Sequence, residues 1–216
     1  MSMFYRFHLK GTVAAAIRSE EDMKNMDKTI ADNAFKIQKK RFDEFMLSNG
    51  FVKYKGTAYV RCNDIDVLEY VGLQKECYGS KTVTVNYALI PLYVPHDYLS
   101  FDLGDRLGVL LIGRDVWWDY SNEKIAEISF SNIMDAVFEY LFPWFRKNSH
   151  KDILMKSILE EKKKRESYGG RLSDIQQLWL DTLMKPVYNA GVMEDNMRVF
   201  KLPSRFVLMK GKLPSL

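Results

Sequence analysis

Thr82-Val83-Thr84-Val85-Asn86-Tyr87-Ala88-Leu89 is the stretch of sequence that decides the fold, because polar and apolar side chains alternate along it. The apolar members are β-branched or aromatic for the most part. An alternation of period two with such residues predicts a strand, which we place at residues 82–92.

Two further strands are predicted upstream of it. Ala58, Val60 and Cys62 alternate with Tyr59, Arg61 and Asn63, and a third apolar segment runs from Asp66 to Lys75. Asn63-Asp64 and Tyr78-Gly79-Ser80-Lys81 supply turn residues between these segments. Because links this short join neighbouring antiparallel strands, we predict an antiparallel meander.

Helical periodicity flanks the strands. Apolar residues recur at intervals of three and four between Thr29 and Ser48, and Gly50 follows as a stop signal. A short apolar strand is expected at Val109–Ile112. A helix with a kink at Pro143 is predicted next, followed by one from Ser149 to Gly169-Gly170 and one begun by Ser173 with Gln176 in a capping box. From Pro186 onward the pattern is weak.

These elements predict an α+β fold, in which an antiparallel β-meander packs against an N-terminal helix and C-terminal helices. We expect a core domain at residues 1–148. Residues 149–216 are expected to form a helical extension packed on or beside this core.

The composition favours a cytoplasmic protein. The chain has 216 residues, of which 47% are hydrophobic, and no window approaches the roughly 18 apolar residues of a membrane span. The segment Met1–His8 lacks the apolar stretch of a secretion signal. Cys62 and Cys77 are therefore expected to be buried thiols.

The basic charge of the chain lies in its C-terminal part. The net charge is +4, and residues 146–216 contain 15 basic against 8 acidic side chains. The run Lys162-Lys163-Lys164-Arg165 is flanked by glutamates, which is typical of a solvated helix face. Binding of nucleic acid through this region is the less favoured interpretation.

The sequence lacks the motifs of easily recognised enzymes, such as His-Glu-x-x-His, Cys-x-x-Cys, a phosphate-binding glycine loop and Gly-x-Ser-x-Gly. Its histidines, His8, His96 and His150, are far apart. We therefore expect neither a metal nor a cofactor. The best enzymatic candidate is the acidic group Asp102, Asp105, Asp115 and Asp119, which could bind a cation; turn formation and pairing with arginine are favoured instead.

The tryptophan pair Trp117-Trp118 is the strongest candidate for binding. Neighbouring side chains on a strand point to opposite faces, so one indole should enter the core and the other should lie near the surface. Tryptophan and arginine are enriched in binding hot spots. The candidate binding residues are Trp117, Trp118, Arg114, Arg106, Asp115, Gln74, Tyr98 and Phe101.

Several of these residues belong to a set that resembles a bacterial family known only as a domain of unknown function. The set comprises Gly50-Phe51, Gly56, Tyr59, Arg61, Val71-Gly72-Leu73-Gln74-Lys75, Val83-Thr84-Val85-Asn86, Arg106-Leu107-Gly108 and Trp117-Trp118. It covers about residues 30–145. The resemblance implies a compact α+β domain and carries over no activity or catalytic residue.

The sequence thus favours a non-enzymatic protein-binding module with a protein partner that is not identified. Two alternatives stay open: an enzyme or metal-binding protein that uses Asp102, Asp105 and Asp115, and a nucleic-acid-binding protein that uses the basic C-terminal region. The oligomeric state is open as well, because the C-terminal helices could pack on the sheet or on a second copy.

Overall fold

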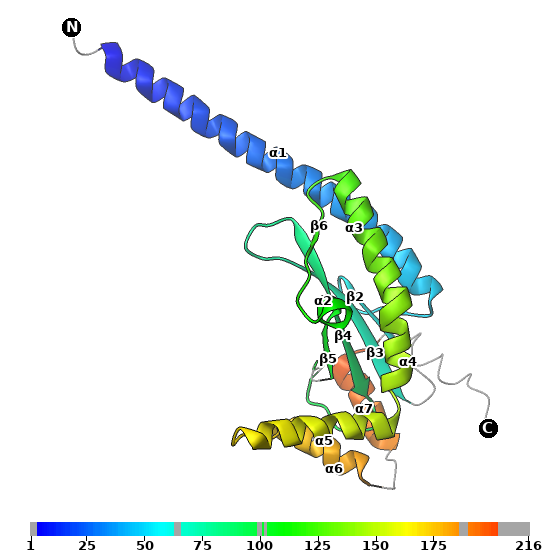
Figure 1. The fold of residues 1–216 in the computed structure, drawn as a ribbon. Helices are drawn as coiled ribbons and strands as arrows, with labels where there is room; N and C mark the ends of the chain where they lie inside the picture. The colour runs from blue at the N-terminus through cyan, green and yellow to red at the C-terminus, as the bar shows by residue number, and fades with distance from the viewer. Residues whose placement is uncertain (1–3, 63–65, 99–100, 102, 186–189, 203–216) are drawn as a thin grey trace.

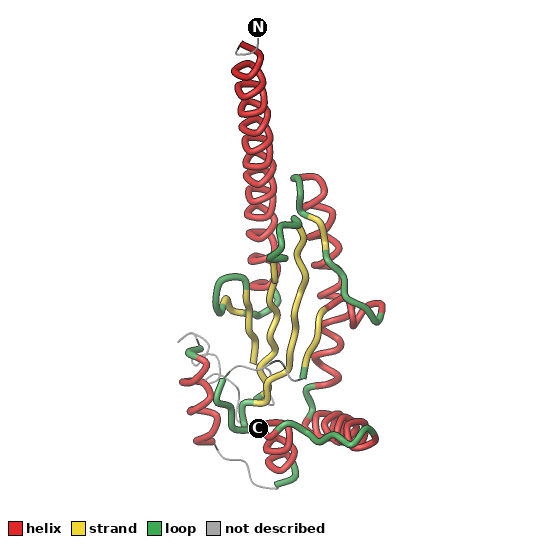
Figure 2. The backbone as a smooth tube through the Cα atoms, turned by 90° about the vertical axis from the view of Figure 1, so that its left-hand side faces the viewer, coloured by secondary structure: helices red, strands yellow, loops and turns green. Residues whose placement is uncertain are grey.

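A computed structural model describes residues 4–62, 66–98, 101, 103–185 and 190–202 of the chain. It contains an antiparallel sheet with helices on both faces (Figures 1 and 2), which confirms the predicted α+β fold. The order β1-β2-β3-β4-β5 follows the chain, so the predicted meander is confirmed as well.

The sheet is built around its two longest strands. These are β3 (Val67–Lys75) and β4 (Thr82–Pro91), and β2 (Ala58–Cys62) and β1 (Val52–Lys53) extend the sheet beyond β3. On the other edge of β4, β5 (Gly104–Arg106) and β6 (Trp118–Asp119) pair with different parts of the same strand. The segment between β4 and Leu107, where no strand was predicted, therefore contributes the short strand β5.

The expected strand at Val109–Ile112 is wrong, because this segment belongs to helix α2 (Leu107–Ile112). Four consecutive apolar residues have no period, so they fit a buried helical turn as well as a strand. Gly113 ends α2 with φ of 72°, a left-handed conformation that glycine adopts without strain. The helix carries the chain from β5 to β6.

Helix α1 (Phe4–Ser48) is much longer than the helix predicted at residues 29–48. Figure 1 shows that its N-terminal part stands clear of the rest of the molecule. The described side chains from Met23 to Ile30 are exposed, whereas Ala31, Ala34, Phe42 and Met46 are buried on the sheet and α3. Gly50, with φ of 82°, then turns the chain toward β1.

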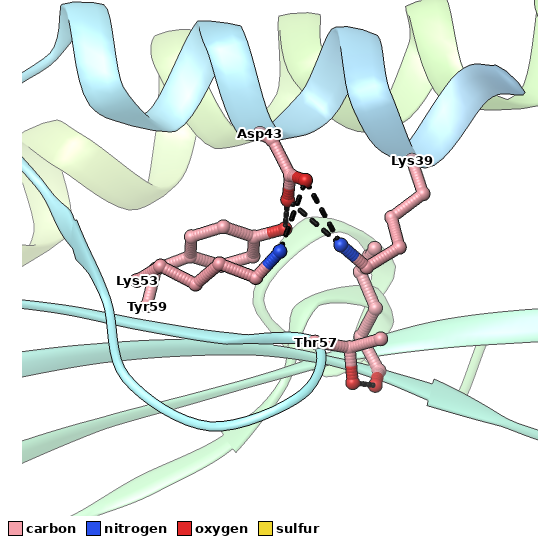
Figure 3. Close-up of polar contacts among 6 residues, drawn as sticks. Lys39, Asp43, Lys53, Thr57 and Tyr59 are labelled. Carbon is pink, nitrogen blue, oxygen red and sulfur yellow. Dashed lines mark hydrogen bonds and ion pairs between the residues drawn. The ribbon is translucent and has the colours of Figure 1, made fainter. Parts of the chain in front are cut away.

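A polar network fixes the C-terminal part of α1 to the sheet (Figure 3). The Asp43 carboxylate accepts hydrogen bonds from Lys39 Nζ at 2.9 and 3.0 Å, from Lys53 Nζ at 3.2 Å and from the Tyr59 hydroxyl. Lys53 lies in β1 and Tyr59 in β2, and the Tyr59 residue is fully buried. The network therefore sets the direction in which α1 leaves the fold.

A second long helical segment covers the same face of the sheet. It consists of α3 (Glu123–Ala136), the π-helical turn η1 (Val137–Leu141) and α4 (Phe142–Asn148). Pro143 has no N–H to donate to the preceding turn, and the irregular turn lies directly before it. Phe130, Ile133, Val137 and Phe145 are completely buried against α1 and the sheet.

Three helices follow α4. The first two are α5 (Lys151–Ser167) and α6 (Asp174–Leu183), and α6 begins with the predicted capping box between Ser173 and Gln176. Their residues Leu154, Ile158 and Trp179 join the main core. The domain boundary at residue 148 stays a prediction.

The last helix is α7 (Ala190–Phe200), which lies where the sequence pattern was weak. It covers one end of the opposite sheet face, where Met193, Met197 and Phe200 pack on Val60, Leu68 and Ile90. Asn196 interrupts the apolar pattern of α7 because it is a buried polar residue. Its amide group donates to the carbonyl oxygens of Leu92 and Val94.

Two expectations from composition have different outcomes. Cys62 is partly buried but Cys77 is exposed, so the prediction of two buried thiols is wrong for Cys77, which lies in the turn after β3. None of the helices in the described ranges is long and apolar enough to cross a membrane.

Candidate functional site

The sheet face that carries α7 at one end is open at the other end. Register places Ala58, Gly72, Asn86 and Arg106 side by side across β2, β3, β4 and β5. Directly opposed residues of an antiparallel sheet point to the same face, so this row forms one floor. Its members on β2 and β3, Ala58 and Gly72, are small, and its members on β4 and β5, Asn86 and Arg106, are polar.

Two polar contacts organise this floor. The Asn86 amide donates to Gln74 Oε1 at 2.8 Å, which links β4 to β3. Arg106, directly opposite Asn86 on β5, forms an ion pair with Asp115. We define the open-face cluster as Gln74, Asn86, Arg106, Asp115 and Trp117.

Trp117 is the aromatic member of the open-face cluster. Trp118 pairs with Val83 and packs against the main core, so Trp117 points to the other side of the strand. There its indole N–H donates to Asp115 Oδ2 at 2.9 Å, and the Arg106 guanidinium lies 5.1 Å from the centre of its ring. One arginine and one carboxylate thus hold the partly exposed indole in place.

The segment that carries Asp115 and Trp117 is itself held tightly. The fully buried Thr84 side chain donates to the Val116 carbonyl oxygen at 2.9 Å. A Cβ atom on Gly108 would collide with the Arg114 carbonyl oxygen and with Val116. Glycine at position 108 therefore lets this segment lie directly on α2, which fixes the cluster before any ligand arrives.

An aromatic pair borders the cluster. The Tyr70 ring leans over Gly72, where any side chain would collide with the Tyr70 hydroxyl. The exposed Phe101 ring packs on Tyr70 with centroids 4.7 Å apart. Burial raises the pKa of the Tyr70 hydroxyl, and the neighbouring Tyr54 adds to this effect, so Tyr70 is a neutral hydrogen-bonding group over the physiological range.

The structure thus brings together most of the candidate residues. Gln74, Arg106, Asp115 and Trp117 form the cluster with Asn86, and Phe101 lies at its border. Arg114 is exposed in the same segment and forms no ion pair within the described part of the chain. Trp118 belongs to the core edge, and Tyr98 lies elsewhere, beside Asp97 and the start of α6.

Asn86 was missed as a site residue, although the sequence carried a signal for it. Thr82, Thr84 and Asn86 are the polar members of the alternation along β4, so they had to share the face opposite the main core. What the alternation does not reveal is that Gln74 lies next to Asn86.

The acidic residues do not form a single site. Asp105 is opposite Tyr87, whose ring belongs to the main core, whereas the next residue, Arg106, points to the open face with Asp115. Asp102 lies outside the described residues. Within the described ranges no group of three or more His, Cys, Asp and Glu side chains is arranged to hold a metal ion.

The basic run of the C-terminal region lies on α5. Arg165 is paired with Glu161 at 2.6 Å, and Lys163 and Lys164 are exposed. This is the arrangement expected of a solvated helix face.

Comparison with known proteins identifies a similar family whose function is unknown. Residues 42–147 match the family described as Domain of unknown function (DUF4304), which confirms the expected resemblance to a domain-of-unknown-function family. The match contains β1 to β6, and with them the whole open-face cluster. No curated protein and no solved structure matches the chain significantly.

Proposed function

We propose that this protein is a non-enzymatic binding module and that a protein partner binds to its open-face cluster. The observation that carries the proposal is the fixed indole of Trp117, which is held by Arg106 and Asp115 and is partly exposed. A side chain that is already ordered loses little entropy on binding, so its apolar area contributes to affinity in full.

The surroundings of Trp117 indicate what the partner offers. The amides of Gln74 and Asn86 are bonded to each other and keep further donors and acceptors for a polar backbone or side chain. Arg114, exposed directly before Asp115 in the chain, is a cation for an acidic group of the partner. We therefore expect a partner surface with one apolar contact for the indole and a carboxylate for Arg114.

The setting that we propose is the bacterial cytoplasm, as the family resemblance and the sequence composition suggest. The proposed partner is a protein from the same cell. Electrostatic attraction through Arg114 contributes chiefly to the association rate, and Trp117 contributes chiefly to the lifetime of the complex.

The proposal is tested by placing a photo-crosslinking residue at position 74 and, as a control, at position 132. Gln74 is exposed at the cluster, and Asn132 is exposed on α3, across the sheet. In the cells of origin we expect a discrete crosslinked product from position 74 only. Equal products from both positions contradict the proposal.

Substitutions show whether the product depends on the cluster. Trp117→Ala should reduce it at least tenfold, which corresponds to the loss of one hot-spot side chain. Tyr168→Ala removes an aromatic side chain that is 83% exposed at the end of α5, and it should leave the product unchanged. An unaltered product with Trp117→Ala would assign the binding to another surface.

A further inference from the structure

A hollow of about 240 Å³ lies on the other side of β5 from the open-face cluster. Residues of β4, β5, α4 and α5 line it, so elements from both halves of the chain form its walls. Its walls combine the aromatic rings of Tyr87 and Trp144 with leucine side chains. The polar side chains that line it are Asp105, Asn148 and Ser157.

The aromatic walls are well fixed. Tyr87 is 4% exposed, and its ring meets that of Trp144 edge to face with centroids 4.8 Å apart. The Asn148 amide donates to the Trp144 carbonyl oxygen at 2.8 Å, which ties the end of α4 below the indole. These contacts therefore hold the two rings in place in the absence of a ligand.

Among the described residues that line the hollow, Asp105 supplies the only charge. One of its oxygens accepts the backbone N–H of Arg106 at 2.7 Å, but the Arg106 side chain points to the opposite face and pairs with Asp115. In the part of the chain that the structure describes, no lysine, arginine or histidine lines the hollow and Asp105 forms no ion pair. A carboxylate is thus placed beside aromatic rings without a cation.

We propose that this hollow binds a small organic ammonium ion. The charged nitrogen would lie at Asp105, its carbon substituents would contact Tyr87 and Trp144, and Ser157 and Asn148 would offer oxygen acceptors. Aromatic rings combined with a carboxylate attract ammonium groups through both cation–π and ionic interactions. The volume equals that of roughly eight water molecules at about 30 Å³ each, enough for a trimethylammonium or butylammonium group.

The test uses tetramethylammonium chloride as the probe and the full chain as the receptor. At constant ionic strength, NMR line broadening and calorimetry should show saturable binding, and tert-butanol, a neutral molecule of similar shape, should bind at least tenfold more weakly. Equal binding of the alcohol, or no saturation, overturns the proposal.

Variants locate the bound ion. Asp105→Asn keeps an acceptor for the Arg106 N–H and removes the charge, so it should weaken the binding of tetramethylammonium at least tenfold. Asp97→Asn, a change at an exposed aspartate beside the start of α6, should have no effect. Ser157→Leu fills the hollow from the exposed side of α5 and should also abolish binding, even if Asp105→Asn fails to fold. Unchanged affinity with Ser157→Leu contradicts the proposal.

Two sources of the ammonium group can be distinguished with the same assay. A blocked lysine dipeptide that binds as tightly as n-butylammonium identifies a lysine side chain of a polypeptide as the ligand class. Tight binding of n-butylammonium alone identifies a free amine. Trp117→Ala should change neither the affinity for the lysine dipeptide nor that for n-butylammonium, because the hollow and the open-face cluster lie on opposite sides of β5.

Discussion

The hydroxyl group of Tyr59 in β2 donates a hydrogen bond to the carboxylate of Asp43 in α1. The buried Tyr59 side chain thereby joins the long helix to the middle of the fold, and Lys39 and Lys53 complete the coordination of the same carboxylate (Figure 3). Burial raises the pKa of the Tyr59 hydroxyl strongly, and the Asp43 acceptor adds to it. Tyr59 is therefore always the donor.

Tyr59→Phe should destabilise the protein by about 1.5–3 kcal/mol. The variant keeps the ring and removes one hydrogen bond to a charged acceptor, and bonds of this kind contribute about that amount. Chemical denaturation measures the change. Tyr78→Phe is the matched control, because Tyr78 is 95% exposed and should be neutral. A loss below about 0.5 kcal/mol for Tyr59→Phe would show that the two lysines satisfy Asp43 by themselves.

A low pH should weaken the polar network around Asp43. Burial opposes ionisation of Asp43, but the hydrogen bonds from Tyr59, Lys39 and Lys53 outweigh it and hold the pKa of its carboxyl below the ordinary value. A lowered pKa stabilises the fold above the unfolded value near 4, and this contribution is lost as the pH falls further. Asp43→Asn should therefore flatten the acid limb of the stability profile, measured by urea unfolding between pH 6 and 3. An acid limb as steep as that of the wild type would contradict this assignment.

The strands were predictable because their signal is local. Alternation along residues 58–62 and 82–91 shows which side chains face the core, and short turns force neighbouring strands together. Val109–Ile112 has no alternation, and its helical state depends on contacts with η1 and β4 that no window of sequence contains. The weak pattern of α7 has a similar cause, since its buried face includes Asn196, whose amide is bonded to the segment that follows β4.

The candidate site was predictable residue by residue but not as an arrangement. Arg106, Asp115 and Trp117 lie close in sequence, so their joint role follows from local spacing. Gln74 reaches them only through the register of β3, β4 and β5, which Asn86 connects. The separation of Asp105 from Asp115 follows from the same alternation, because consecutive residues of β5 point to opposite faces.

A buried ion pair gives a larger predicted effect. Glu69 is 2% exposed, and its carboxylate accepts from Arg61 Nη2 at 2.6 Å and from Arg61 Nε at 2.7 Å. The Arg61 guanidinium lies over the rings of Phe51 and Phe142, at 4.4 and 5.1 Å from their centres. Arg61→Ala should cost about 3–5 kcal/mol, because it leaves a buried carboxylate without its cation.

The double variant Arg61→Met with Glu69→Leu separates the cost of leaving one buried charge unpaired from the net contribution of the ion pair. Removing both charges should restore much of the stability lost in Arg61→Ala, since apolar pairs of similar volume often replace buried ion pairs without loss. Thermal unfolding of the three proteins gives the comparison. A double variant as unstable as Arg61→Ala would mean that the bond from Arg61 Nη1 to the Asn49 carbonyl oxygen is the more important contact.

Asn196 should control the attachment of α7. Its amide donates to Leu92 and Val94, and its oxygen accepts the His96 backbone N–H at 3.0 Å, so all three bonds cross from the helix to the chain after β4. Asn196→Leu leaves these buried groups unsatisfied, at about 1–3 kcal/mol for each. Hydrogen exchange should accelerate in α7 and at His96 while β3 stays protected. Arg198→Leu, an exposed change on the same helix, should leave exchange unaltered.

The order of the Trp117 indole depends on Arg106, and this can be measured without a partner. Arg106→Ala removes the cation beside the ring and the counter-ion of Asp115, so the indole should become mobile and more accessible to acrylamide, with a red-shifted emission. The cost in stability should stay below about 1 kcal/mol, because the ion pair is partly exposed. Arg114→Ala should change neither signal. If acrylamide quenching is unchanged in Arg106→Ala, Asp115 alone fixes the ring. The ordered position of Trp117, on which the proposed binding depends, would then be due to the hydrogen bond from its indole N–H to Asp115.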